Sequence, residues 1–530
     1  MQNSGRFGAS WRKREGAIMQ TAYQLVWMSK ERTPDHLALV DDETGRELTY
    51  AELIEEVDVV AAGLHAAGVR QGDRVATILP SLFDHCVAVL ALQRLAAVPA
   101  LINFRLAPQE IKGMLLDGGM LGVIALPDDE LVSTVRDCLP SNGFIMTVKT
   151  AVPGADCFVA CRGDIASLPC PISAPDDPAF IFYTSGTTGL PKGVVLSHGT
   201  SEPRVVWLST QAGLRQGRHT RALGFMPLSH AIGFYGVFLA TLALNGTYYV
   251  MSAFDPVAAV DAVEKHQITY MFAVPQLYFA MGQAPNYSPD KMRSTDLILY
   301  GGAEIDSGFL TQLDQEWAGT VRHIYGTTET MCSLYHPDPV GQHRRLRPGF
   351  YSRTRIIRIG GDTNEFVAPG EEGELIVDAT GDAVFTEYLN RPEATAEKVR
   401  DGWYYTGDIC LLHDNGDVDL IGRTDDVIRS GGENIHPGDI EAILLAHPGV
   451  KEVAVIGTPD NKWGEVVTAC VAGENLLAVD LGRAVQASGL AAFKRPRRYL
   501  FLDSLPRNAA NKVLRRRLKS LAETSVLQDI

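Results

Sequence analysis

The sequence predicts an α/β protein with a large N-terminal domain, whose parallel or mixed sheets are flanked by helices, and a small α+β domain after it. The chain has 530 residues, which is too long for one ordinary core. From about residue 48, helical stretches alternate with short apolar runs, the pattern of βαβ units. Near Gly422 the sequence becomes short and charged, and a compact segment with its own strands and helices follows.

The expected elements follow in chain order. Residues 50–67 have the pattern of a helix, and the apolar runs 74–79, 86–92, 96–102 and 179–183 have the pattern of buried strands. Further strands are expected at 270–274, 297–300, 355–359 and 373–377, the last of them after a turn at Pro369-Gly370. The apolar segment 236–244 is much shorter than the roughly 20 residues that span a bilayer, so we expect it in the core.

These patterns divide the chain. We expect a large domain over residues 19–422, a connection over 423–426 and a small domain over 427–530. Residues 1–18 are polar, contain Arg12-Lys13-Arg14 and lack the apolar region of a signal peptide. We expect them to be disordered or to come from an over-long start, with an Arg-rich organelle presequence as the alternative.

The composition argues against a nucleic-acid partner. The formal net charge is -15, and a basic face would have to form against that field. One local exception is the basic sequence at 494–498 and 512–519, which is either a solvated helix face or a landing site for ligand phosphates. The eight cysteines have neither Cys-x-x-Cys nor metal-ligand spacing, so we expect a reducing, cytoplasmic compartment.

A loop rich in glycine and hydroxyl groups follows the expected strand 179–183. Its glycines let backbone N–H groups turn toward phosphate oxygens, and its hydroxyls and lysine add donors and charge. A Walker A loop would end in Gly-Lys-Ser/Thr, whereas Gly193 follows the lysine here. A Ser/Gly surface linker is the alternative. The candidate triphosphate ligands are Thr184, Ser185, Gly186, Thr187, Thr188, Gly189 and Lys192.

Four further blocks follow in order: Tyr325-Gly326-Thr327-Thr328-Glu329, Tyr405-Thr406-Gly407-Asp408, Gly422-Arg423-Thr424-Asp425-Asp426, and Pro506-Arg507-Asn508-Ala509-Ala510-Asn511-Lys512. Together with the loop they resemble the adenylate-forming superfamily, which comprises acyl- and aryl-CoA ligases, luciferases and peptide-synthetase adenylation domains. Within it, segments 204–211, 430–437 and 493–514 are most similar to aryl-CoA ligases of the 4-chlorobenzoate type. The similarity extends over nearly the whole chain from Met19.

The resemblance implies a two-step reaction with ATP, Mg²⁺ and coenzyme A. A carboxylate resists a thiol because its oxygen is a poor leaving group, so it is first converted to an acyl-AMP and then transferred to CoA. The small domain is implied to be mobile, turning about a hinge at Asp425. The implied partners are a small carboxylic acid, ATP and CoA, without nucleic acid or membrane; a homodimer is left open.

The resemblance also assigns roles near the nucleotide. Lys512 is implied to bridge the acid's carboxylate and the α-phosphate, and Glu329 to bind Mg²⁺ together with Thr184. His230 is implied to lie between the acyl pocket and the CoA tunnel, although a lone His is more often a core group. Helix capping and turns are the alternative roles for Glu329 and Asp408. The implied AMP ligands beyond the phosphate loop are Tyr325, Thr328, Asp408 and Arg423.

The CoA and acyl sites follow from the same resemblance. The implied CoA residues are Arg94, Gly432, Glu433, Trp463, Phe493 and Arg495, with core packing as the alternative for the two aromatic ones. The implied acyl pocket consists of Trp207, His230, Ala231, Ile232, Phe272, Gly301, Ile324, Gly326, Met331 and Cys332.

The implied acyl pocket contains no formal charge except a histidine, which favours a flat apolar acid of the benzoate type and disfavours dicarboxylates and amino acids. Trp207 replaces the Phe of the resembled ligases, and Cys332 replaces an Asn. A medium-chain or alicyclic acid is the alternative substrate, and loading of a carrier protein is the alternative reaction.

Overall fold

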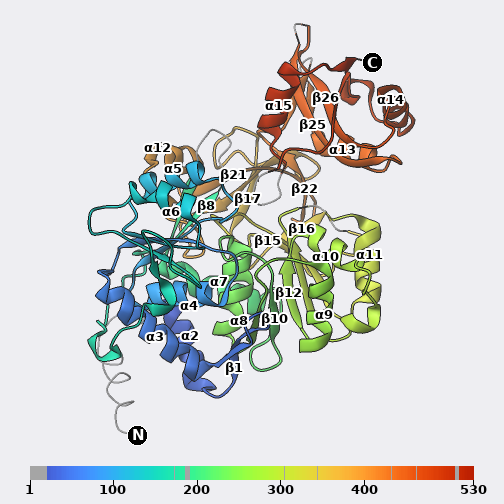
Figure 1. Ribbon diagram of the computed structural model, residues 1–530. Helices are drawn as coiled ribbons and strands as arrows, with labels where there is room; N and C mark the ends of the chain where they lie inside the picture. Colours follow the sequence, from blue (N-terminus) through green and yellow to red (C-terminus); the bar gives the residue numbers. More distant parts are fainter. Residues whose placement is uncertain are drawn as a thin grey trace.

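The computed structural model describes residues 21–171, 173–184, 191–303, 305–342, 344–430, 433–460, 462–507 and 513–529. Two sheets with their helices form the body of the molecule, and a third sheet forms a separate lobe at the C-terminal end (Figure 1). The predicted α/β architecture is confirmed.

The first sheet carries the candidate phosphate loop. Its strands lie in the order β19 (Glu387–Tyr388), β9 (Lys192–Ser197), β8 (Pro178–Thr184), β4 (Val98–Leu101), β3 (Arg74–Ile78), β5 (Gly122–Ala125), β6 (Phe144–Thr147) and β7 (Asp156–Cys157). The strands from β8 to β7 are parallel, and β9 returns antiparallel to β8. The loop of interest is therefore the connection of a β-hairpin.

Both faces of this sheet are buried, as expected for a parallel sheet. Phe180 and Phe182 of β8 join the core that contains α2 (Ala22–Arg32), α3 (Tyr50–Ala66) and α4 (Phe83–Arg94). Ile181, between them, joins the opposite core with α5 (Pro108–Gly118) and α6 (Asp129–Arg136). This alternation, which strand geometry requires, explains why the sequence of β8 is continuously apolar.

The second sheet is parallel in one half and antiparallel in the other. The half from β1 to β14 is parallel apart from the edge strand β2, and antiparallel pairing begins at β14–β15. Its strands are β1 (Leu37–Asp41), β2 (Arg46–Thr49), β10 (Arg221–Gly224), β11 (Thr247–Val250), β12 (Tyr270–Ala273), β13 (Leu297–Gly301), β14 (Thr320–Tyr325), β15 (Leu334–His336), β16 (Arg345–Pro348), β17 (Thr354–Ile357), β18 (Glu372–Asp378), β20 (Val399–Arg400), β21 (Trp403–Leu412) and β22 (Val418–Arg423).

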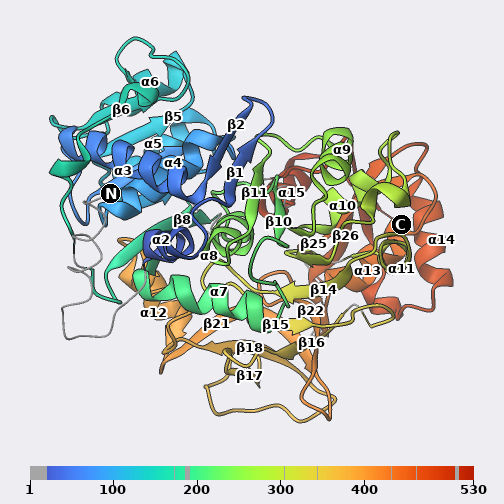
Figure 2. The same cartoon turned by 90° about the horizontal axis from the view of Figure 1, so that it is seen from below.

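Helices pack against this second sheet on the large body. They are α7 (Ser201–Thr210), the π-helix η4 (Ile232–Leu239), α8 (Ala240–Ala243), α9 (Pro256–His266), α10 (Pro275–Gly282), α11 (Ser307–Glu316) and α12 (Pro392–Lys398). Short 3₁₀ turns of the body are η1 (Phe158–Ala160), η2 (Ile165–Ser167), η3 (His198–Thr200) and η5 (Pro289–Met292), and one more, η6 (Ala492–Lys494), lies in the C-terminal lobe. Figure 2 shows β17 and β18 at one margin of the body, with α7 between them and α2.

The C-terminal lobe has its own sheet and cores. Its strands are β23 (Ile428–Ser430), β24 (Glu433–Ile435), β25 (Val450–Asp460), β26 (Gly464–Gly473), β27 (Arg498–Leu502) and β28 (Gln528–Asp529). Its helices are α13 (Pro437–Leu445), α14 (Ala478–Ala487) and α15 (Arg515–Thr524). Two apolar cores lie on the two faces of this sheet, with Val455 in one and Ile456 in the other.

The prediction of a strand at 86–92 was wrong, because these residues lie inside α4. Every residue of α4 except Asp84 is buried, so the helix is apolar on all sides and its sequence lacks the 3.6-residue period that marks a surface helix. The other expected elements are present within one to two residues at each end, and segment 236–244 is buried in the core as predicted.

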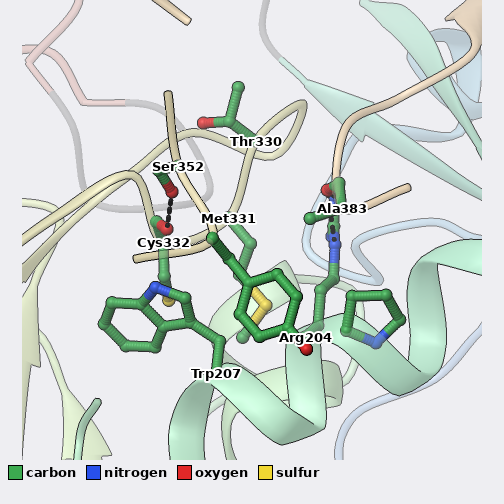
Figure 3. A pocket seen from close by; sticks show the side chains of 9 residues that line it. Arg204, Trp207, Thr330, Met331, Cys332, Ser352 and Ala383 are labelled. Atoms are coloured by element: carbon green, nitrogen blue, oxygen red, sulfur yellow. Dashed lines mark hydrogen bonds between the residues drawn. The ribbon is translucent and has the colours of Figure 1, made fainter. Parts of the chain in front are cut away.

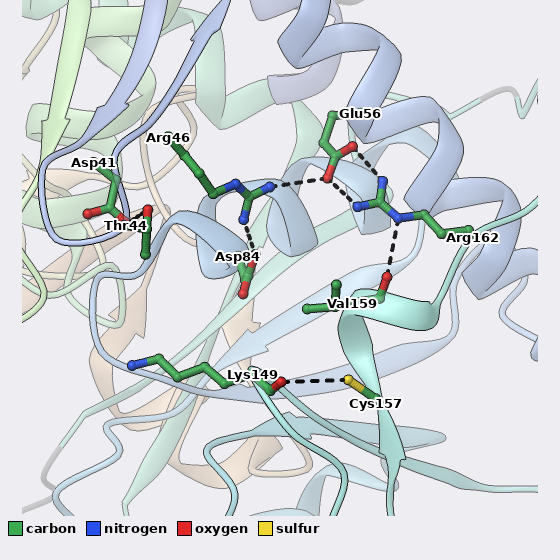
Figure 4. A network of polar contacts seen from close by, with 9 residues as sticks. All are labelled: Asp41, Thr44, Arg46, Glu56, Asp84, Lys149, Cys157, Val159 and Arg162. Atoms are coloured by element: carbon green, nitrogen blue, oxygen red, sulfur yellow. Dashed lines mark hydrogen bonds and ion pairs between the residues drawn. The ribbon is translucent and has the colours of Figure 1, made fainter.

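Charged side chains fasten the N-terminal hairpin to the body (Figure 4). Arg46 of β2 pairs with Asp84 of α4 at 2.9 Å and with Glu56 of α3 at 3.4 Å. Arg162 donates two hydrogen bonds to Glu56, at 2.5 and 2.7 Å. The network joins segments that are far apart in sequence, around residues 46–56, 84 and 162.

Neither a disulfide nor a membrane-spanning helix is found in the part of the chain that the structure describes. All eight cysteines are free thiols. Among the described residues, no helix is both long and apolar enough to cross a membrane.

Candidate active site

A buried carboxylate with two strong donors lies on β21. The hydroxyl of Tyr325 donates to Oδ2 of Asp408 at 2.5 Å, and Nη1 of Arg423 donates to Oδ1 at 2.7 Å. The pairing of β21 with β22 places Asp408 directly opposite Arg423. Burial and the Asp408 charge raise the pKa of Tyr325, so its hydroxyl remains a proton donor. A fixed, charged carboxylate of this kind suits recognition of vicinal hydroxyl groups.

A second buried carboxylate lies at the end of the Tyr325–Glu329 motif. Glu329 is 8% exposed, and its Oε1 accepts a hydrogen bond from the Tyr388 hydroxyl at 2.7 Å. The Nζ of Lys192 lies 5.0 Å from the centre of the Tyr388 ring. Tyr388 therefore stands between Glu329 and the first residue of β9, where the phosphate loop ends.

The position of the loop also follows from the hairpin. Thr184 and Lys192 are paired across β8 and β9, so the two ends of the connecting segment lie side by side at the same end of the sheet. Its predicted ligands Ser185, Gly186, Thr187, Thr188 and Gly189 lie outside the described residues. Thr184 and Lys192 at the two ends are both half-buried.

The donor set fits Mg²⁺ held jointly with phosphates. No cluster of three or more metal-ligating side chains occurs among the described residues. Glu329 supplies one carboxylate and Thr184, at the end of β8, one hydroxyl, which is the kind of sparse oxygen set that Mg²⁺ uses when substrate phosphates supply the other ligands.

His230 lies at the start of an unusual helix. Its Nε2 is 3.5 Å from Nδ2 of Asn103, which follows β4. The chain after it forms the π-helix η4, a form that is rare and often found at functional sites. A side chain at Gly233 would collide with the Pro227 carbonyl oxygen, so the backbone packs tightly there. Two different sheets thus contribute to the surroundings of His230.

The apolar residues of the implied acyl pocket are packed together. Gly301 of β13 pairs with Ile324 of β14, and a Cβ at Gly301 would lie 3.6 Å from the Phe272 ring. A Cβ at Gly236 would come within 2.7 Å of the other edge of that ring. A side chain at Gly326 would collide with the Met331 carbonyl oxygen. One core cluster contains Trp207, Phe272, Ile324, Met331 and Cys332, with Ile232 packed against it.

Arg204 is a residue that the sequence reasoning missed. It is 2% exposed, lies one helical turn before Trp207 on α7, and lines a pocket with Trp207, Met331 and Cys332 (Figure 3). Arg204 therefore places a formal positive charge beside three residues of the implied acyl pocket. The sequence did contain one signal for such a residue, an arginine beside an apolar helix face. A buried arginine requires charged or hydrogen-bonding partners, so its position could have been questioned. Burial raises the pKa of Cys332 to about 12, so that neighbour is a neutral thiol.

The junction between the body and the lobe is bounded by ion pairs. On one side Arg423 ends β22 and pairs with Asp408; on the other, Asp426 lies 3.6 Å from Arg515 of α15. Asp425 between them is exposed. A further contact joins His436, at the start of α13, to Glu372 of β18 at 2.9 Å. The polypeptide between the two sheets is only residues 424–427.

The lobe presents aromatic and basic groups at its surface. Trp463 lies between Lys462 and Arg497, whose charged ends are 4.9 and 4.8 Å from its ring. Phe493 is 42% exposed, so core packing does not explain it. Arg495 donates its Nε to the Leu490 carbonyl, and Glu433 is exposed. Gly432 and Lys512 lie outside the described residues.

Arg94 does not meet the expectation that it binds CoA phosphates. Its side chain is 3% exposed and pairs with Asp58 at 3.0 Å, and its Nη1 donates to the Pro169 carbonyl. It is a structural ion pair beneath the surface. Arg105, two residues after the His230 neighbour Asn103, is exposed.

Comparison with known proteins agrees with this geometry. Residues 26–389 match the model of the AMP-binding enzyme family, and residues 439–512 match the AMP-binding enzyme C-terminal domain. A 4-chlorobenzoate–CoA ligase of Arthrobacter sp. is 44% identical over 503 residues, covering 94% of this chain and 95% of the relative. One from Pseudomonas sp. (strain CBS-3) is 38% identical, covering 94% of both.

A solved structure adds ligands to the comparison. The o-succinylbenzoate CoA synthetase of Bacillus subtilis, in complex with ATP and magnesium ion, is 26% identical, covers 94% of this chain and 99% of its own, and has a TM-score of 0.81. The similarity extends through both the body and the lobe.

Proposed function

The chain belongs to the AMP-binding enzyme family and is an AMP-forming acid–CoA ligase, and on that premise we propose how its residues divide the work. The observation that carries the proposal is the pair of buried carboxylates, Glu329 and Asp408, each held by a tyrosine hydroxyl. We assign Asp408 to the ribose hydroxyls of ATP, with Arg423 and Tyr325 fixing its position. Thr328 and the phosphate hairpin complete the nucleotide site.

In the first half-reaction a carboxylate oxygen of the acid attacks the α-phosphorus of ATP, and the bond to pyrophosphate breaks. Glu329 and Thr184 would hold the Mg²⁺ that neutralises phosphate charge. Lys192 and the hairpin donors bind the β- and γ-phosphates. Lys512 neutralises the repulsion between the carboxylate and the α-phosphate, so its contribution is electrostatic.

In the second half-reaction the CoA thiolate attacks the acyl carbon, and AMP leaves. We propose that the lobe of residues 427–530 rotates about 423–426, with Asp425 as the hinge, so that Lys512 withdraws and the segment from Ser430 faces the site. The junction lies between the ion pair of Arg423 with Asp408 and that of Asp426 with Arg515, and this supports placing the hinge between them. His230 separates the acyl pocket from the entering thiol.

For CoA, we propose that Trp463 and Phe493 contact the nucleotide and Arg495 binds phosphate, with the backbone near Gly432 and Glu433 beside the pantetheine arm. Arg105 takes the place first expected for Arg94, because it is exposed and adjacent to the Asn103–His230 contact. The half-buried Trp463 and the exposed Phe493 can stack on a nucleotide base, and the cations beside them can bind its phosphates.

For the acid, we propose an aromatic one of the benzoate type. Phe272, Ile324 and Ile232 supply apolar side chains to one core, and a side chain at Gly301 or Gly326 would collide with a backbone carbonyl oxygen. The relatives named for 4-chlorobenzoate support the same class. Isotope exchange between pyrophosphate and ATP, measured without CoA, tests this: it should depend on an added benzoate, and exchange supported only by C6 to C12 fatty acids would contradict it.

A further inference from the structure

Asn103 lies at the edge of the first sheet from which the phosphate hairpin also leaves. Strands β4 and β8 are parallel neighbours, with Leu101 paired to Phe182. Asn103 follows the carboxyl end of β4, and the hairpin follows the carboxyl end of β8 at Thr184. In open α/β sheets, ligands bind beyond the carboxyl ends of the strands. The half-buried Asn103 therefore belongs to the same edge of the sheet as the proposed nucleotide site.

The backbone around Asn103 forms a tight turn. The N–H of Leu106 donates to the Asn103 carbonyl at 3.2 Å, and the N–H of Arg105 donates to the side-chain oxygen Oδ1 of Asn103 at 3.0 Å. The second bond is the pattern of an Asx turn, which Asn and Asp form because their side chains are short acceptors. The side chain of Asn103 thus fixes the turn that presents the exposed Arg105.

The same bond decides which end of the Asn103 amide faces His230. Because Oδ1 accepts from the backbone, the group that lies 3.5 Å from Nε2 of His230 is the NH₂ group. An NH₂ group only donates, so this contact is attractive only when Nε2 carries a lone pair. The ring is then neutral, with its proton on Nδ1, since an imidazolium would present a second N–H to the amide. Asn103 therefore favours one tautomer and the uncharged ring.

Backbone bonds fix where the His230 side chain begins. Its N–H donates to the Pro227 carbonyl at 3.0 Å, and its carbonyl accepts from the N–H of Phe234 at 2.9 Å. These bonds leave the rotation of the imidazole ring undetermined. At 3.5 Å the contact from Asn103 is at the long end of the hydrogen-bond range, so it orients the ring without locking it.

We propose that Asn103 is a positioning residue for the CoA half-reaction: one end of its amide sets the turn that carries Arg105, and the other end orients the neutral ring of His230. The inference rests on the proposed function, because His230 and Arg105 are assigned there to the entry of the thiol and to CoA. A neutral ring also suits the proposed apolar acid, since a charged ring beside that acid would be costly to bury.

Asn103→Asp separates the two ends of the amide. A carboxylate still accepts the Arg105 N–H and keeps the turn, but it offers the histidine an acceptor in place of a donor. Thioester formation from preformed benzoyl-AMP should fall about five- to tenfold, the factor for one hydrogen bond, and pyrophosphate exchange by less than about twofold. The control is Asn286→Asp, which adds the same charge after α10, where Asn286 contacts Asp261 and the Val257 carbonyl. It should change neither half-reaction.

His230→Phe completes a double-mutant cycle. It keeps an aromatic ring but removes both ring nitrogens, so adding Asn103→Asp to it should have no further effect on thioester formation. Thermal melts of each variant confirm folding before the rates are compared.

Three results would overturn the inference: an unchanged thioester rate in Asn103→Asp, an equal loss in both half-reactions, or the same loss in the His230→Phe background. If His230→Phe itself leaves thioester formation unchanged, the proposed role of His230 fails and this inference fails with it. If His230→Phe slows that step and Asn103→Asp does not, only this inference fails.

Discussion

The Tyr388 hydroxyl donates to Oε1 of Glu329 at 2.7 Å, with both groups buried. Burial and the Glu329 charge raise the pKa of Tyr388, so the hydroxyl keeps its proton and remains the donor. Tyr388 lies on β19, which pairs with β9 directly after the phosphate hairpin. One side chain thus couples the orientation of the proposed metal ligand to the strand that carries Lys192.

Tyr388→Phe should therefore weaken adenylation without preventing folding. Loss of a hydrogen bond to a charged group costs about 1.5–3 kcal/mol, so we expect kcat/KM to fall about ten- to hundredfold. The Mg²⁺ concentration for half-maximal exchange should rise. Tyr278→Phe is the control, because its buried hydroxyl donates to the Leu299 carbonyl in another core. Equal Mg²⁺ dependence in the two variants would rule out the role of Tyr388.

Asp408→Asn should raise the KM for ATP. The substitution keeps the size of the side chain but removes the charge that Arg423 faces and one of its two acceptor oxygens. An increase of about tenfold or more is expected from the loss of charge-assisted bonds. Initial rates at varied ATP and saturating acid measure it. If the variant has lost acid binding but retains the wild-type KM for ATP, the ribose hydroxyls bind elsewhere and the assignment of Asp408 is contradicted.

Lys512→Ala should separate the two half-reactions. Pyrophosphate exchange should fall by about 10² to 10³, the usual loss for one stabilising donor. Thioester formation from preformed acyl-AMP should be nearly unchanged, because the lysine is proposed to withdraw before that step. Single-turnover assays measure each half separately. Equal losses in both would contradict a lysine that acts only in adenylation.

His85 makes stability depend on pH. It is buried, with Nδ1 2.9 Å from the Pro80 carbonyl and Nε2 2.9 Å from the Thr77 hydroxyl. Burial lowers its pKa from 6.5 to about 4. The neutral ring is favoured in the folded state, so this stability is present above pH 6.5 and is lost as the pH falls toward 4.

The corresponding loss is roughly 2 kcal/mol between pH 7 and pH 5, from about 1.4 kcal/mol per pH unit below the unfolded pKa. Urea denaturation at both pH values measures it. His85→Gln should be less stable at pH 7, with a pH dependence smaller by that amount. A pH dependence identical to that of the wild type would show that other groups control acid stability.

The sequence predicted the elements whose pattern is local. The strand over 179–183 and the loop after it could be predicted from an apolar run and its glycines, because a buried parallel strand is apolar on both faces; the return strand β9, which makes that loop the connection of a hairpin, was not predicted. The helix α4 could not be recognised in the same way, since its burial on all sides removes the helical period. The elements that bury α4 are distant in sequence, so its burial could not be predicted from the local pattern.

Residues of the candidate site could be predicted only where they belong to a sequence motif. Glu329 and Asp408 lie in motif blocks, and their tyrosine partners fit the expected chemistry. Arg94 and Arg105 differ only in tertiary environment: one is covered by α2 and α3, and the other follows a strand end and is exposed. Arg204 was missed for the same reason, because its carbonyl partners come from residues 124 to 179 positions away.

The most direct test of the account is product analysis with ATP, Mg²⁺ and CoA across benzoates, cinnamates, alicyclic acids and C6 to C12 fatty acids. The account predicts equal amounts of AMP and an aryl-CoA thioester, with benzoates as the best substrates. AMP release without any CoA ester, or a clear preference for linear fatty acids, would contradict it.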